Sequence, residues 1–69
     1  MPLSMSKIGD AKTVIKINGK DETRHFLENL GFVEGAEVTV VSQIGGNLIV
    51  NVKETRVAID RAMANRIIV

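Results

Sequence analysis

Two glycines four residues apart, Gly31 and Gly35, separate a helical pattern from a strand pattern and constrain the fold more than any other feature. Before them, Phe26, Leu27 and Leu30 fall within one apolar stripe of a helix, since offsets of one and four residues share a helix face. At Gly31 the chain must turn left-handed to leave that helix, which costs a glycine little. Gly35 marks a second bend. The pattern predicts a short amphipathic helix, a tight turn and then a strand.

The residues after this turn alternate as a half-buried strand does. Val38 and Val40 supply the apolar positions. Glu37 and Thr39 supply the polar positions, within a strand predicted over residues 37–42.

A hairpin turn is predicted after this strand. Gly45 and Gly46, followed by Asn47, suit a tight turn whose central residues need positive φ angles. On the return strand, three apolar side chains share one face: Leu48, Val50 and Val52. Four glycines are therefore interpreted as structural turn residues: Gly31, Gly35, Gly45 and Gly46.

The remaining strands are expected before the predicted helix and after the predicted hairpin in the sequence. Residues 13–18 form a β-branched run that predicts a first strand, and residues 57–59 and 67–69 predict two more. Asp21 can cap the helix that follows it, and Asp60 can cap a brief helical turn before the last strand.

These elements predict a mainly β fold, a small barrel of about five strands with one short α-helix inserted after the first strand. The 69 residues form a single domain, residues 1–69, because the chain is too short to divide between two cores. Residues 1–10 are expected to form an N-terminal arm, from which Met5 and Ile8 pack against the core.

The composition argues against several classes of function. The chain has no cysteine, so neither disulfides nor thiolate metal sites can form. Its net charge is +1 and charges of both signs alternate, which gives no broad electrostatic surface for nucleic acid or anionic lipid. No apolar run approaches the ~18 residues of a membrane span, and the first residues do not resemble a secretory signal. We expect a cytoplasmic protein with no nucleic-acid partner and no membrane insertion.

His25 is the only histidine and the side chain best suited to a metal. It points away from the apolar stripe, and Glu22 and Glu28 flank it at three-residue offsets. Such a set is incomplete and exposed, so it would hold a transition metal only weakly. We therefore predict no cofactor and no metal site. No nucleophile and base can be paired by spacing, so we also predict no catalytic residues and no enzymatic activity.

The predicted helix and its exit turn offer the best surface for a protein partner, because they combine apolar and charged residues. The hypothesis assigns partner contacts to six residues: Arg24, His25, Glu28, Phe32, Val33 and Glu34. In a second interpretation Phe32 folds back and covers the end of the barrel, since large apolar residues are usually buried. The hairpin tip at Asn47 is a second candidate surface.

The order and spacing of these motifs resemble the ferrous iron transport protein A (FeoA) family. The central match is Leu30-Gly31-Phe32, then Gly35 and Val38. Matches to the family's opening and ending surround it: Gly9, Val14, Ile15 and Ile17, then Val57-Ala58-Ile59, Ala64, Ile67 and Val69. Many members carry Pro-Leu-Gly-Asp-Pro in the central hairpin, where this chain has residues 43–47 and matches only at Gly45.

This resemblance implies an SH3-like barrel and a non-enzymatic cytosolic accessory protein of bacterial ferrous iron uptake. Its implied partner is the cytosolic face or G-protein domain of a FeoB-type membrane transporter, whose activity it would modulate. One alternative is a regulatory module like the C-terminal SH3-like domain of diphtheria-toxin-repressor-type metalloregulators, although the chain shows no helix-turn-helix. A small RNA-binding barrel is a further alternative, disfavoured because such barrels present stacking aromatics on a basic face.

Overall fold

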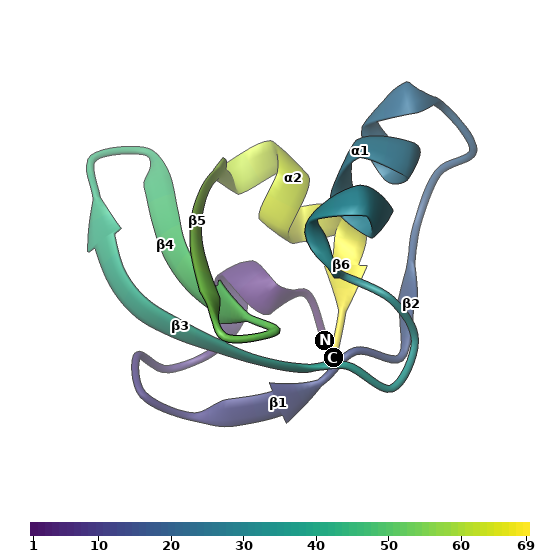
Figure 1. Cartoon of the computed structure of the whole chain (residues 1–69). Coiled ribbons are helices and arrows are strands. Elements are labelled where there is room, and N and C mark those ends of the chain that lie inside the picture. The colour runs from purple at the N-terminus through teal and green to yellow at the C-terminus, as the bar shows by residue number, and fades with distance from the viewer.

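Strand β3 (Glu37–Ile44) is the longest strand and lies inside a four-stranded antiparallel sheet. The computed structural model describes residues 1–69. The sheet has the order β1-β3-β4-β5, with β1 (Ala11–Thr13), β4 (Asn47–Val52) and β5 (Thr55–Asp60). It curls around the centre of the molecule, with helix α2 (Arg61–Arg66) beside β5 and helix α1 (Glu22–Leu30) on the side away from the β3–β4 hairpin (Figure 1).

Alternation along β3 and β4 builds one wall of the core. Val38 pairs with Val52 and Val40 pairs with Val50, and all four side chains are buried. The register shifts between Val40 and Ser42, where a bulge bends the strand. The predicted alternation and hairpin are confirmed. The full core comprises thirteen buried residues: Leu3, Val14, Ile17, Leu27, Phe32, Val38, Val40, Leu48, Val50, Val52, Ile59, Ala64 and Ile67.

The run predicted as one first strand, residues 13–18, is divided between two sheets. The N–H of Val14 donates to the carbonyl of Ala36, whereas the N–H of the next residue, Ile15, donates to the carbonyl of Ile68. The chain therefore passes from the large sheet to a two-stranded one, formed by β2 (Lys16–Ile17) and β6 (Ile67–Ile68).

The second short helix, α2 (Arg61–Arg66), begins as predicted at Asp60. The Asp60 carboxylate accepts a hydrogen bond of 2.7 Å from the N–H of Met63, which satisfies one of the free donors of the first turn. The segment predicted as a strand over residues 57–59 is longer, since β5 begins at Thr55 and runs to the cap.

The N-terminal arm packs differently from the prediction. Met5 and Ile8 are 70% and 57% exposed, whereas Leu3 is fully buried. The reason is a 3-10 helix, η1 (Leu3–Met5), closed by a bond from the N–H of Met5 to the carbonyl of Pro2. Because a tight turn directs successive side chains apart, Leu3 enters the core while Met5 points to solvent.

The two ends of the chain pair with each other. The amino group of Met1 donates to the carbonyl of Val69, and the N–H of Val69 donates to the carbonyl of Met1, both at 2.8 Å. Pro2 forms a bridge with Ile68, so the arm adds to the edge of the two-stranded sheet. The N and C labels accordingly lie side by side in Figure 1.

The predicted mainly β class is confirmed, with helix α1 (Glu22–Leu30) inserted between β2 and β3. Six strands replace the expected five because the first run is split. None of the helices has the length and apolar character needed to cross a membrane.

Candidate functional site

Helix α1 begins and ends as its sequence predicts. Asp21 lies in extended backbone before the helix, and its carboxylate accepts a hydrogen bond from the N–H of Arg24. At the other end Gly31 is left-handed, with φ +113°. The N–H of Gly31 donates to the carbonyl of Glu28, and the N–H of Phe32 donates to the carbonyl of Leu27. These two bonds form a Schellman motif, which satisfies the last carbonyls of the helix.

The same motif explains why Phe32 is fully buried. In a Schellman motif the residue after the glycine packs on the helix residue whose carbonyl its N–H reaches, here Leu27. Both side chains belong to the core. The hypothesis that Phe32 contacts a partner is therefore wrong, and the second interpretation, in which it covers the interior, is confirmed.

The prediction for Phe26 is wrong in the other direction. The sequence predicts that Phe26 belongs to the buried stripe of the helix, but this residue is 49% exposed. Successive helical residues lie about 100° apart, so Phe26 lies about 100° around the helix from the buried Leu27, whereas Leu30 lies only about 60° from it. Leu30 is accordingly half-buried against the core. A helical wheel centred on Leu27 would have identified Phe26 as a surface aromatic.

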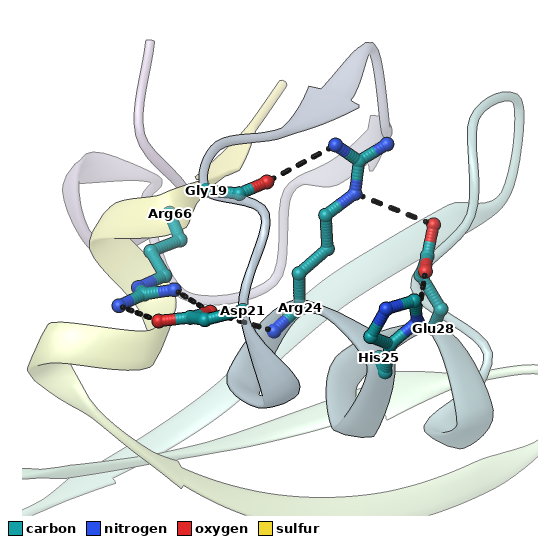
Figure 2. A network of polar contacts seen from close by, with 6 residues as sticks. All are labelled: Gly19, Asp21, Arg24, His25, Glu28 and Arg66. Atoms are coloured by element: carbon teal, nitrogen blue, oxygen red, sulfur yellow. Dashed lines mark hydrogen bonds and ion pairs between the residues drawn. The ribbon is translucent and has the colours of Figure 1, made fainter.

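The three charged residues assigned to the helix surface lie together in one ion-pair cluster (Figure 2). The guanidinium of Arg24 is 3.6 Å from the Glu28 carboxylate and donates a 3.0 Å hydrogen bond to the carbonyl of Gly19. The Nδ1 atom of His25 is 3.6 Å from the other oxygen of Glu28. The His25 side chain is 74% exposed and points outward, as the sequence predicts.

A second contact fixes the start of α1 against the end of α2. Arg66 donates two hydrogen bonds to the Asp21 carboxylate, at 2.6 and 3.1 Å (Figure 2). These bonds hold the pKa of the Asp21 carboxyl below its ordinary value and raise the pKa of the Arg66 guanidinium. Because Asp21 also caps α1, a single carboxylate both starts the helix and orients it on the neighbouring one.

The exit turn carries the last two hypothesised contacts. Val33 is half-buried and Glu34 is exposed. The N–H of Gly35, whose φ is +87°, donates to the carbonyl of Val14, and the N–H of Ala36 donates to the carbonyl of Val33. The turn is therefore fixed to the first strand region by hydrogen bonds.

The predicted hairpin turn is formed by the two glycines at its tip. Gly45 has the positive φ expected of it, +60°, whereas Gly46 does not. The carbonyl of Gly46 instead accepts a hydrogen bond from the N–H of Arg61, which connects the tip to α2.

Only one carboxylate, that of Glu28, lies close enough to His25 to share a metal ion with it. No three side chains among the histidine and the carboxylates lie close enough together to hold a metal ion.

The outer surface of α1 combines the half-exposed aromatic side chain of Phe26 with the paired charges of Arg24 and Glu28.

A curved antiparallel sheet with short closing strands is the architecture of small SH3-like domains, and an inserted helix with an exposed face is the distinctive addition here. Comparison with family profiles identifies the family of SH3-like domains to which the chain belongs. This chain belongs to the FeoA domain family, whose profile matches residues 1–69. No match was found among curated protein sequences.

Solved structures agree with this assignment. An iron uptake regulatory protein (FeoA) is 34% identical, with a TM-score of 0.87 over 97% of this chain and 91% of that one. FeoA of Stenotrophomonas maltophilia, an SH3 domain protein complexed with zinc, is 31% identical, with a TM-score of 0.89 over 99% and 87%. FeoA of Chlorobium tepidum is 30% identical, with a TM-score of 0.90 over 99% and 67%.

A manganese-dependent transcriptional repressor shares the fold but not close sequence similarity. It is 20% identical, and the match covers 97% of this chain and 39% of that one, with a TM-score of 0.86. A likeness at this identity shows the fold alone. The chain is therefore an SH3-like protein of the family connected with ferrous iron transport.

Proposed function

We propose that this chain is a non-enzymatic cytosolic accessory protein of ferrous iron uptake, which docks on the cytosolic face or G-protein domain of a FeoB-type membrane transporter. The FeoA family match over the whole chain supports this proposal. So does the description of the Stenotrophomonas maltophilia relative as possibly a ferrous iron transport activating factor. Docking would modulate transport or nucleotide turnover by the transporter.

The observation that carries the docking site is the half-exposed Phe26 on the outer face of α1. Aromatic and arginine side chains dominate the binding energy of protein interfaces when they are surrounded by less critical contacts. Phe26 lies beside His25 in the sequence and shares the helix with Arg24 and Glu28. We assign the docking surface to the outer side of α1 and its exit turn: Arg24, His25, Phe26, Glu28, Val33 and Glu34.

Substitutions on this surface are expected to weaken binding to the transporter's cytosolic domain while the protein stays folded. Phe26→Ser and Arg24→Glu should each raise the dissociation constant about tenfold or more, as loss of an interface anchor does. Val33→Asp should also weaken binding, with some loss of stability because Val33 is half-buried. Calorimetric titration with the purified cytosolic domain, paired with thermal melting, measures both effects.

Ile44→Ser is the matched control, since Ile44 is a 66% exposed apolar residue at the far end of β3. The β3–β4 hairpin and α1 lie at opposite sides of the molecule in Figure 1. Unchanged binding by the α1 variants, together with loss of binding on substitution of Ile44 or Asn47, would move the contact to the hairpin. If the wild-type chain formed no complex at all, the docking proposal would fail.

We also propose that the isolated chain holds neither ferrous iron nor zinc tightly. His25 has one carboxylate, that of Glu28, within 4 Å, and tight sites need several converging donors with a supporting second layer of contacts. Anaerobic calorimetric titration should show no saturable binding at micromolar metal. A stoichiometric complex of sub-micromolar dissociation constant that is lost in His25→Ala, but kept in Glu34→Gln, would overturn this expectation.

A further inference from the structure

A cavity of about 370 Å³ opens at the end of the large sheet, where β3 begins and β4 turns into β5. None of the residues that surround it belongs to the proposed docking surface. Seven residues line it: Ala36, Glu37, Thr39, Asn51, Val52, Lys53 and Glu54. The lining combines two carboxylates and one lysine with two uncharged polar and two apolar side chains, which is enough chemical variety to select a ligand.

The turn beside this cavity has a strained backbone. Lys53 and Glu54 have φ angles of +49° and +63°, and they alone among the non-glycine residues have positive φ. They form the two-residue loop between the paired residues Val52 and Thr55. Such a loop favours Asn-Gly, because a side chain at positive φ is disfavoured. Strained residues are found at binding sites, where they aim a functional group. Here the strained turn contributes the carboxylate of Glu54 to the lining of the cavity.

Neither of the two carboxylates has a cationic partner within the chain. The ion pairs of the structure lie on α1 or between its cap Asp21 and α2, and none includes Glu37 or Glu54. Lys53 also lines the cavity, and its stem lies against the end of α1, since a Cβ added to Gly31 would be 3.1 Å from the Lys53 Cδ atom. Arg56, on β5, is bound through its Nε to the side-chain oxygen of Asn51 at 3.2 Å. No lysine or arginine nitrogen lies within 4 Å of either carboxylate, so both acidic groups remain available to a cation.

The lining of the cavity also offers unused hydrogen-bonding groups. Thr39 and Asn51 face each other across β3 and β4, and both are half-buried. Asn51 uses its side-chain oxygen to accept from Arg56, which leaves its amide N–H groups free. Ala36 and Val52 add apolar contact. The two unpaired carboxylates and the two apolar side chains of the lining match a side chain that has a methylene stem and a cationic end.

We infer that this cavity binds an arginine side chain of a partner polypeptide, with the guanidinium between the carboxylates of Glu37 and Glu54. A planar guanidinium has five N–H donors and can bond two carboxylates at once, which a lysine ammonium does less well. The arginine stem then lies along Ala36 and Val52. The inference does not depend on the α1 docking surface and can be tested without the transporter.

The probe is the peptide acetyl-Gly-Arg-Gly-amide, compared with the same peptide carrying neutral citrulline. In a titration followed by amide NMR spectra, the arginine peptide should shift the signals of residues 36–39 and 51–54 and saturate. The dissociation constant of the citrulline peptide should be about fivefold higher than that of the arginine peptide, as expected for loss of an exposed ionic contact. Equal binding of both peptides, or shifts confined to other parts of the chain, would overturn the inference.

Variants test the two carboxylates and the strained turn separately. Glu37→Gln and Glu54→Gln should each weaken binding of the arginine peptide about fivefold, whereas Glu22→Gln, which changes an exposed carboxylate outside both the cavity and the docking surface, should not. The double change Lys53→Asn with Glu54→Gly should raise the melting temperature and yet weaken binding. Because that variant is the more stable protein, unfolding cannot explain its loss of affinity. Unaltered binding by this variant would contradict the inference.

Discussion

Replacing Phe32 with alanine is expected to leave the domain largely unfolded near physiological temperature. The side chain is fully buried in the core, and removing a buried phenylalanine costs about 3–5 kcal/mol of the free energy of unfolding. At roughly 0.05–0.15 kcal/mol per residue, a chain of this size has a total of only about 3–10 kcal/mol. The melting temperature, followed by circular dichroism, should fall by on the order of 20 °C or the transition should disappear.

Phe26→Ala is the matched control for this experiment, because it removes the same side chain from a position that is 49% exposed. Its cost should stay below about 1 kcal/mol, as for surface substitutions in general. If the two variants lost equal stability, the burial of Phe32 by the Schellman motif would be wrong. Together with the docking experiment, this pair separates the structural phenylalanine from the one proposed to bind a partner.

The second large effect is expected at Gly31, where a side chain meets two obstacles. The backbone is left-handed, with φ +113°, and an added Cβ would be 3.1 Å from the Lys53 Cδ and 3.3 Å from the Val52 Cγ2. Gly31→Ala should cost about 1–2 kcal/mol and the β-branched Gly31→Val about 2–3 kcal/mol of the free energy of unfolding. Since each 1 kcal/mol lowers the melting temperature of so small a domain by ~4–8 °C, thermal melting distinguishes these variants.

Two further variants separate the obstacles. Gly35 also has a positive φ, +87°, but a Cβ there meets nothing within 4 Å, so Gly35→Ala measures backbone strain alone. Adding Lys53→Ala to Gly31→Ala should recover the part of the cost that comes from contact with the lysine stem. An unchanged melting temperature in Gly31→Val would show that the junction between α1 and β3 is not built as described.

The local parts of this fold could be predicted from sequence because they depend on neighbouring residues. Asp21, Asp60 and Gly31 act within one helical turn, so their roles as caps follow from position alone. The alternation of β3 and β4 is equally local. Division of the first strand could not be predicted, because it depends on which distant carbonyl each amide meets. The carbonyls of Ala36 and Ile68 belong to different sheets.

The candidate site shows the same limit at its two phenylalanines. The turn position of Phe32 leaves both a surface role and burial open in the sequence, and the hydrogen bonds that end α1 direct the side chain inward. Apolar spacing places Phe26 near Leu27 in the predicted stripe, yet α1 buries only the sector around Leu27 that faces the core. The cavity at the β4–β5 turn escaped prediction altogether, since Lys53 and Glu54 carry no sequence signal for positive φ.

The pairing of Met1 with Val69 has a consequence for how this domain can be combined with other proteins. Because the first and last residues exchange two hydrogen bonds, the entry and exit points of the domain are only one strand spacing apart. A surface loop of a host protein could therefore carry the whole unit as an insert without its own ends being forced apart. By the same geometry, a short linker could join the ends and the chain could be reopened between Gly45 and Gly46, at an exposed hairpin tip.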